Sequence, residues 1–385
     1  MMIKRYAFYF ALIILLSCKK TYSPHVISTS QNYLVVEGFI NSGIDPTVIK
    51  LSRTVSLNSN VSSTAEDGAI VTVEDNQSNN YPLNQAGKGT YSSAPLAIDN
   101  ARKYRLRIKT NDGNEYLSDL VQVKASPPID SVGYQISGNS LNIYVNAHDP
   151  NNATRYYRWD YQETWQFHSN YNSEYLIAGD TIIPRPPAQS IYYCFANDVS
   201  SSVILTSTTK LGQDVVYQTP ITQITSTSEK LEVKYSILVR QYALTQDAFE
   251  FWQELKKNTE QIGSIFDTQP SSSIGNIHCI SNPAEHVVGF ISAGSISTKR
   301  IFITNAQVPF GWIAKSPYDC ENQEAYFEDP NTHQNDVEAI LYSSGNYVIT
   351  SAIIQNNAIV GYSYSSEECT DCTLRGVKQQ PAFWK

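Results

Sequence analysis

Apolar and polar residues alternate with a period of two along much of this chain. In residues 103–109, Tyr104, Leu106 and Ile108 alternate with four basic residues. Because successive side chains of a strand point to opposite faces, this pattern predicts a strand with one buried and one solvated face. Similar runs predict strands at 33–39, 47–55, 69–74 and 116–123. Short strands with turn-rich gaps favour an immunoglobulin-like antiparallel β-sandwich over residues 31–126.

The alternation stops at Pro127-Pro128, because proline has no N–H group to donate to a β-ladder. We place a domain boundary there, with residues 130–385 forming a second and larger sandwich. Its strands are predicted at 141–145, 155–161, 231–242, 286–292, 300–304, 339–342, 347–354 and 358–364. The strand at 155–161 is aromatic on both faces, which is typical of a central strand covered by another layer.

One helix is predicted in the second half, at about 245–262. Thr245 is a suitable N-cap, and Ala248, Trp252 and Leu255 begin an apolar stripe at helical spacing, which we interpret as core packing. The 26 tyrosines and the many β-branched residues also favour strands. The sequence therefore predicts a mainly β protein with tandem immunoglobulin-like β-sandwich domains, of which the second is larger and carries one inserted α-helix.

The N-terminus has the pattern of an export signal. Lys4 and Arg5 precede a short apolar segment at 7–16, which is too short to span a bilayer as a mature helix. The segment ends in Leu15-Leu16-Ser17-Cys18, which looks like a bacterial lipobox. We therefore predict a signal peptide at 1–17, acylation of Cys18 by palmitate-type chains and a flexible tether at 18–30. The alternative is an ordinary signal peptide with an incidental cysteine.

The net charge of the chain bears on which classes of molecule it can bind. The formal net charge is −8, and no block of basic residues occurs along the chain. Proteins that bind nucleic acid present a basic surface to the phosphates, so we expect no nucleic-acid partner.

Five cysteines follow Cys18, and in an oxidising compartment all are disulfide candidates. They are Cys194, Cys279, Cys320, Cys369 and Cys372. The last two have the spacing of a redox motif, but no βαβ pattern surrounds them, and a structural zinc site would need four ligands. We expect disulfides, no metal and no cofactor. Our first expectation joins Cys320 to Cys369 or Cys372, because both regions lie in late loops; one thiol then stays free or pairs elsewhere.

No catalytic motif is recognisable, since the chain lacks a nucleophile elbow, a phosphate loop and a dinucleotide fingerprint. His148-Asp149 is more simply a turn. We expect a protein that is not an enzyme. The alternative is a carbohydrate-binding module or glycosidase-like enzyme in which Trp159, Trp165 and Trp312 stack on sugars. Exposed rings of Trp165 and Trp312 in a cleft with two carboxylates would favour that alternative.

Several segments, taken together in their order, resemble domain-of-unknown-function family 4249. They are Tyr33-Leu34-Val35-Val36-Glu37-Gly38, Gly89-Thr90-Tyr91, 116–119, Pro127-Pro128-Ile129-Asp130, Tyr157-Arg158-Trp159, Gly275-Asn276-Ile277-His278-Cys279, Gly289-Phe290, Arg300-Ile301-Phe302-Ile303, Cys369-Thr370-Asp371-Cys372 and Pro381-Ala382-Phe383-Trp384.

The resemblance implies a lipoprotein of Bacteroidota that is encoded beside a TonB-dependent outer-membrane transporter. We therefore expect a protein anchored in the outer membrane by its acyl chains, on the periplasmic face or at the cell surface. Its expected role is a non-catalytic accessory or ligand-binding partner of the transporter for an unknown nutrient. Lys19 and Lys20 depart from the acidic residues that tend to follow the acylated cysteine in surface-exported lipoproteins of these bacteria. The inserts at 166–189 and 306–335 are long for plain connections, and we expect them to carry the ligand surface.

Overall fold

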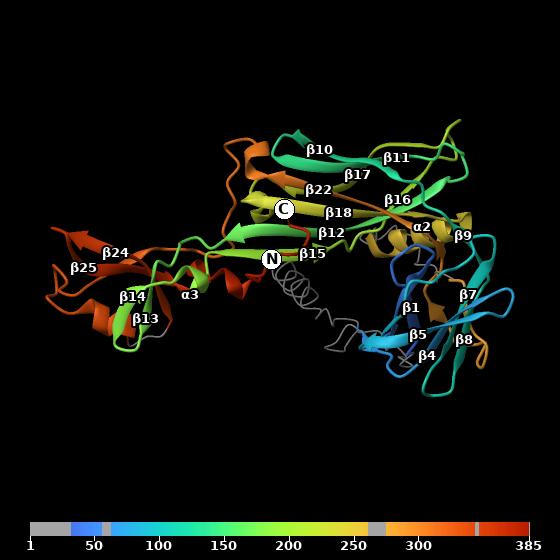
Figure 1. The fold of residues 1–385 in the computed structure, drawn as a ribbon, viewed down its shortest axis with the longest axis horizontal. Coiled ribbons are helices and arrows are strands. Elements are labelled where there is room, and N and C mark those ends of the chain that lie inside the picture. Colours follow the sequence, from blue (N-terminus) through green and yellow to red (C-terminus); the bar gives the residue numbers. More distant parts are fainter. Residues whose placement is uncertain (1–31, 56–62, 261–274, 343–345, 385) are drawn as a thin grey trace, which may run out of the picture.

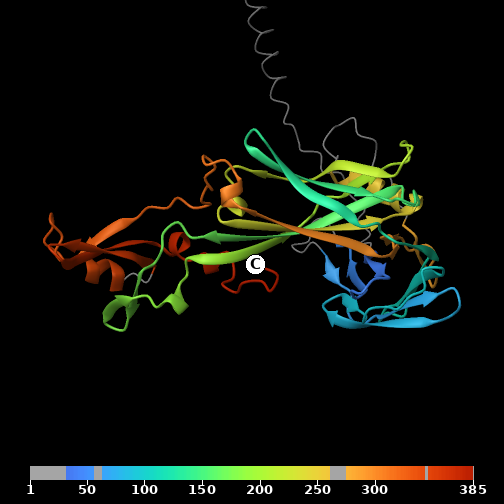
Figure 2. The same ribbon diagram turned by 45° about the horizontal axis from the view of Figure 1, so that its top comes forward.

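The computed structural model describes residues 32–55, 63–260, 275–342 and 346–384. The predicted signal peptide, Cys18 and the tether lie outside the described residues. The chain is mainly β, as predicted, and its strands form three units in a row (Figures 1 and 2). We call these the first unit, the central sandwich and the distal unit. None of the helices in the described part is both long and apolar enough to cross a membrane.

The first unit is one twelve-stranded sheet that runs mostly antiparallel. Nine of its strands come from the N-terminal part, namely β1 (Leu34–Asn41), β2 (Val48–Arg53), β3 (Thr64–Ala65), β4 (Ile70–Asp75), β5 (Asn80–Gly87), β6 (Thr90–Ser92), β7 (Lys103–Lys109), β8 (Glu115–Ser118) and β9 (Val121–Lys124). The run predicted as one strand at 116–123 is thus two strands. The alternating residues of β7 are buried as expected, with Tyr104 and Ile108 fully covered.

Three short strands from far along the chain complete this sheet. They are β19 (Ile277–Cys279), β20 (Val287–Val288) and β21 (Ala293–Gly294). β19 pairs with β8, and β20 and β21 lie parallel to β1. β21 also bridges to β9, and β9 pairs with β7, so the sheet closes on itself around its core. This differs from the expected sandwich of two separate sheets, because the bridging strand comes from beyond the boundary placed at Pro127-Pro128.

The central sandwich has two layers. One is a three-stranded sheet of β10 (Ile129–Ser137), β11 (Ser140–His148) and β17 (Val215–Thr225). The other contains β15 (Tyr193–Val199), β12 (Tyr156–His168), β18 (Lys234–Ala243), β22 (Ile296–Thr304) and β16 (Ile204–Ser207). Their facing side chains, such as Ile143 on one layer and Trp159 and Tyr235 on the other, share one core. β12 pairs on both edges, which confirms the central strand predicted from its aromatic residues.

The predicted helix is confirmed as α2 (Gln246–Glu260), with residues 261–274 outside the described part. Thr245 Oγ1 accepts a hydrogen bond from the Ala248 N–H at 3.2 Å, so it is the N-cap. Ala248 is buried beside Tyr242 and Leu244, and the partly buried Phe39 of β1 packs against this small cluster. α2 therefore lies where the first unit meets the central sandwich (Figure 1).

The distal unit lies at the opposite end of the row from the first unit (Figure 1). It contains β13 (Tyr175–Ala178), β14 (Thr181–Pro184), β23 (Gln323–Tyr326), β24 (Tyr347–Gln355), β25 (Ala358–Ser366), α3 (Glu367–Thr370) and a π-helix at Val337–Tyr342. Short 3₁₀ turns lie at Pro187–Gln189, Glu229–Leu231, Asn305–Gln307 and Cys372–Leu374.

Two predicted strands are wrong. Residues 339–342 belong to the π-helix, and 286–292 are irregular apart from Val287–Val288. An apolar run of this length is too short to show whether its period is that of a helix or of a strand. Leu341, in the π-helix, is buried in the core of the distal unit.

Candidate functional site

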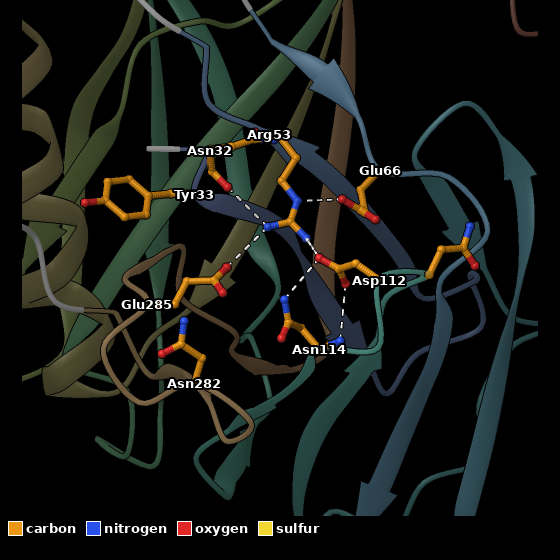
Figure 3. Close-up of a pocket in the computed structure, with 9 residues that line it drawn as sticks. Asn32, Tyr33, Arg53, Glu66, Asp112, Asn114, Asn282 and Glu285 are labelled. Atoms are coloured by element: carbon orange, nitrogen blue, oxygen red, sulfur yellow. Dashed lines mark hydrogen bonds and ion pairs between the residues drawn. The ribbon is translucent and has the colours of Figure 1, made fainter. Parts of the chain in front are cut away.

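The first candidate site is a pocket of about 580 Å³ on the first unit, which we call the Arg53 pocket (Figure 3). Arg53 is the last residue of β2, and Glu66 follows β3. Asp112 lies in the turn between β7 and β8, and Glu285 lies in the loop between β19 and β20. Amide side chains form much of the remaining wall, namely Asn32, Asn111, Asn114 and Asn282.

Arg53 is the centre of this pocket and is only 8% exposed. Its Nε donates to Glu66 at 2.5 Å, and its other nitrogens pair with Glu285 at 3.2 Å and Asp112 at 3.6 Å. The hydroxyl of Tyr116 donates to Glu285 at 2.7 Å. Burial acts to lower the pKa of Arg53, but its bonds to Glu66 and Tyr116 outweigh it and raise that pKa above its ordinary value.

Three carboxylates surround one guanidinium, so the Arg53 pocket carries excess negative charge. It would repel anions and favour cationic or hydroxyl groups. Since every side of the guanidinium is already engaged, we interpret Arg53 as a structural tie between β2 and the distant loop that holds Glu285. Across the described ranges, no group of three or more His, Cys, Asp or Glu side chains is arranged to hold a metal ion.

The second candidate site is larger, about 780 Å³, and lies between the first unit and the central sandwich. We call it the groove. One wall comes from β1 and β2, and the opposite wall comes from α2 and strands β12, β18 and β22. Its apolar lining includes Val36, Phe39, Val48, Trp252, Leu255 and Phe290. A volume of this size lined by aromatic side chains with a few polar groups is typical of a small-molecule site.

The charged groups on the wall formed by the central sandwich are Arg158, Asp160 and Arg240. The Arg158 guanidinium lies 4.2 Å from the ring centre of Tyr242 and 4.4 Å from that of Trp252. Arg240 donates to Asp160, and Arg158 pairs with the same carboxylate at 3.8 Å. Burial acts to lower the pKa of Arg240, but Asp160 outweighs it and raises that pKa.

Four of the five disulfide candidates form two bridges. Cys320 is bonded to Cys369, which confirms our first expectation, and Cys194 is bonded to Cys372. The two cysteines of the redox-like spacing therefore have different, distant partners. Cys279 is a buried free thiol on β19.

The tryptophans proposed as sugar-stacking residues lie in the core of the central sandwich. Trp159 and Trp165 are 1% and 9% exposed, and their ring N–H groups donate to Gln241 and Glu229. Trp312 is half-buried and packs against the same core. Both rings take part in packing, so the expected contact of Trp165 and Trp312 with a ligand stays a prediction.

The sequence reasoning missed both arginines that organise the two cavities. The sequence does contain an indication of Arg158, since it is a charged residue inside a predicted strand that is aromatic on both faces. It contains none of Arg53, because its partners lie in segments that only the folded chain brings together.

No curated protein matches this chain. A crystal structure of a DUF4785 family protein from Legionella pneumophila is similar at 10% identity, over 54% of this chain and 52% of that one, with a TM-score of 0.18. Pullulanase complexed with maltotriose, from Anoxybacillus sp., is similar at 10% identity, over 51% of this chain and 26% of that one, with a TM-score of 0.16. A family model matches residues 19–300, and the chain therefore belongs to the family described as Domain of unknown function (DUF4249).

Proposed function

We propose that this protein is a lipid-anchored outer-membrane lipoprotein that serves as a non-catalytic accessory of a TonB-dependent transporter, and that it engages the transporter through the distal unit. The observation that supports this proposal is which segments of the sequence build the distal unit. The two long inserts, 166–189 and 306–335, lie far apart in sequence and supply β13, β14 and β23 to the same small body.

The distal unit is built as a rigid projection. Tyr175 of β13 meets Tyr362 of β25 edge to face at 5.4 Å between ring centres, and Ile182 of β14 packs on the same cluster. The disulfide between Cys320 and Cys369 joins the segment before β23 to α3 at the end of β25. A preformed surface binds a partner at a lower cost in conformational entropy than a loose loop.

The free end of this projection exposes large apolar side chains. Ile354 of β24 and Ile359 of β25 are paired directly across the hairpin and are 64% and 42% exposed. Phe327, next to Val360 in the neighbouring strand pair, is also exposed. A cluster of exposed apolar side chains on a rigid element is typical of a protein-docking surface.

Two further features support the proposed location at the outer membrane. Two disulfides fit a protein that folds outside the cytoplasm. A lipobox at Leu15-Leu16-Ser17-Cys18 would confine the protein to the membrane plane, where even a modest contact with a transporter is strengthened by a high effective concentration.

Co-purification from solubilised outer membranes tests this proposal. Ile354→Lys combined with Ile359→Lys should abolish capture of the transporter while leaving the abundance of the lipoprotein unchanged. The matched control is Ile44→Lys, since Ile44 is 90% exposed on the first unit. Wild-type capture by the double variant, or an equal loss with the control, would refute docking through the distal unit. Point variants are preferable to deleting 166–189, because that insert includes Phe167, which is fully buried.

The carbohydrate-handling alternative gains no support from the site. It needs aromatic rings open to a sugar, and Trp165 and Trp312 are both packed against the core of the central sandwich.

A further inference from the structure

Within the described part of the chain, no residue accepts a hydrogen bond from the guanidinium of Arg158. Arginine has five N–H donors, and none of them donates a hydrogen bond to any of the described residues. Its Nε is buried from solvent, and its side chain is only 18% exposed. The nearest carboxylate, Asp160, stands 3.8 Å away and already accepts a hydrogen bond from Arg240. A mostly buried cation without an acceptor is costly, so its retention in a cavity needs an explanation.

The neighbours of Arg158 hold the group in place without satisfying its donors. Tyr242 and Trp252 lie over its faces at 4.2 and 4.4 Å from their ring centres. Stacking of this kind fixes the plane of a guanidinium and leaves its N–H groups pointing outward along the edge. That edge matches the two oxygens of a planar or tetrahedral anion.

The charge in this part of the groove favours an anion. Two arginines, Arg158 and Arg240, face a single carboxylate, Asp160, which leaves an excess of one positive charge among these three groups. The wall formed by the first unit adds Glu37, Asp45 and Lys50. All three of these side chains belong to exposed residues, where solvent screens them more strongly than it screens the arginines.

The rest of the groove is apolar. Phe39 of β1 meets Tyr242 edge to face at 5.2 Å, and Phe290 lies against Phe251 at 5.3 Å. With Trp252, these rings provide aromatic walls beside the arginines. A ligand with an apolar body and one anionic group would cover the rings and supply the missing acceptor together.

We propose that the groove binds a small amphipathic organic anion, with its anionic group on Arg158 and its apolar or aromatic body between Phe39, Trp252 and Phe290. This inference does not depend on the transporter partnership. It assigns a ligand class to a cavity at the opposite end of the molecule from the proposed docking surface.

Two fluorescent probes with the same aromatic body test the proposal on the whole protein. 1-Anilinonaphthalene-8-sulfonate carries one negative charge, and N-phenyl-1-naphthylamine is neutral. Wild-type protein should bind the anionic probe more tightly than the neutral one. Arg158→Gln should weaken binding of the anionic probe about tenfold or more and change binding of the neutral probe by less than about threefold, because only the anionic probe makes a charge-assisted contact with the guanidinium.

Two matched variants complete the design. Arg105→Gln removes an equal charge from the first unit, outside the groove, and should leave both affinities unchanged. Thr298→Trp fills the groove from the exposed side of β22, opposite Arg240, and should weaken binding of both probes.

Three results would overturn the proposal. Equal affinity of Arg158→Gln and wild type for the anionic probe would overturn it, as would a parallel loss of both probes in a variant that melts at the wild-type temperature. Unchanged binding of both probes by Thr298→Trp would also overturn it. If Arg158→Gln fails to fold, the comparison of the two probes on wild type and Thr298→Trp decides.

Discussion

Arg53 and Glu285 form an ion pair at 3.2 Å although 232 residues separate them in the chain. The pair joins the end of β2 to the loop between β19 and β20, and so fastens the late segment onto the first unit. Both side chains are largely buried, at 10% and 14% exposure. The pair therefore belongs to the class in which removal of one partner leaves the other charge poorly solvated.

Arg53→Met should lower the free energy of unfolding by about 3–5 kcal/mol, because Glu66 and Glu285 would lose their shared buried counter-charge. Urea denaturation followed by tryptophan fluorescence measures the loss. The control is Arg105→Met, whose partner Glu74 keeps a second arginine, Arg107; this change should cost less than about 1 kcal/mol. Equal losses in the two variants would contradict the structural role of Arg53.

The disulfide pattern predicts a specific peptide map. Non-reducing digestion should yield one peptide pair containing Cys194 and Cys372, and another containing Cys320 and Cys369. Cys279 should resist alkylation in the native protein, because it is 3% exposed, and should react after unfolding without reductant. A bridge to Cys279, or a bond between Cys369 and Cys372, would show that the pairing is different.

Replacing Cys320 and Cys369 together by serine should lower the free energy of unfolding by about 4 kcal/mol, since the bond closes a loop spanning a sequence separation of 49. Guanidinium denaturation measures the change. Cys279→Ser is the matched control, because it alters a buried thiol but opens no loop. If the double variant were no less stable than this control, the bridge would not constrain the distal unit.

We expect the carboxylate of Asp75 to stabilise the folded protein, and this stabilisation should be lost at acidic pH. Burial acts to raise the pKa of Asp75, but hydrogen bonds from Asn79 and Arg102 outweigh it and hold that pKa well below its usual range. Because the folded pKa is depressed, the stabilisation is complete above about pH 4, the unfolded value, and is lost as the pH falls toward the folded pKa.

The stability lost on Asp75→Asn should therefore be the same at pH 7 and pH 5, and should shrink at pH 3 and again at pH 2. Urea denaturation at each pH measures it. Asp99→Asn is the control, because Asp99 is 55% exposed and meets Arg102 only at 3.5 Å, so this change should have a small effect. A loss that stays constant down to pH 2 would show that Asp75 does not ionise as inferred.

The proposed anchor predicts the behaviour of Cys18→Ala. Without a thiol to acylate, the variant should take up no labelled fatty acid and should leave the membrane fraction. Metabolic labelling and fractionation measure both effects, with Cys279→Ser as a control that keeps the anchor. Wild-type labelling and membrane retention in Cys18→Ala would refute the lipoprotein assignment.

The sequence alone determined the features that depend on neighbours in the chain. Period-two alternation located β7 and β11, because side chains on a strand must point alternately to core and solvent. Thr245 marked the start of α2 through a cap that needs only the next three residues. The sequence left Cys369 and Cys372 as alternative partners of Cys320, because both lie in the late loops, and the structure shows the bond to Cys369.

The tertiary structure alone decided which distant segments meet. Strands β19 to β21 are two or three residues long, too short to carry a periodic signal, and they form only because β1, β8 and β9 offer edges to pair with. The same holds for Arg158, whose aromatic neighbours come from β18 and α2. The local alternation of apolar and polar residues determines on which face of a strand each side chain lies. The packing of the whole chain determines which residues that side chain contacts.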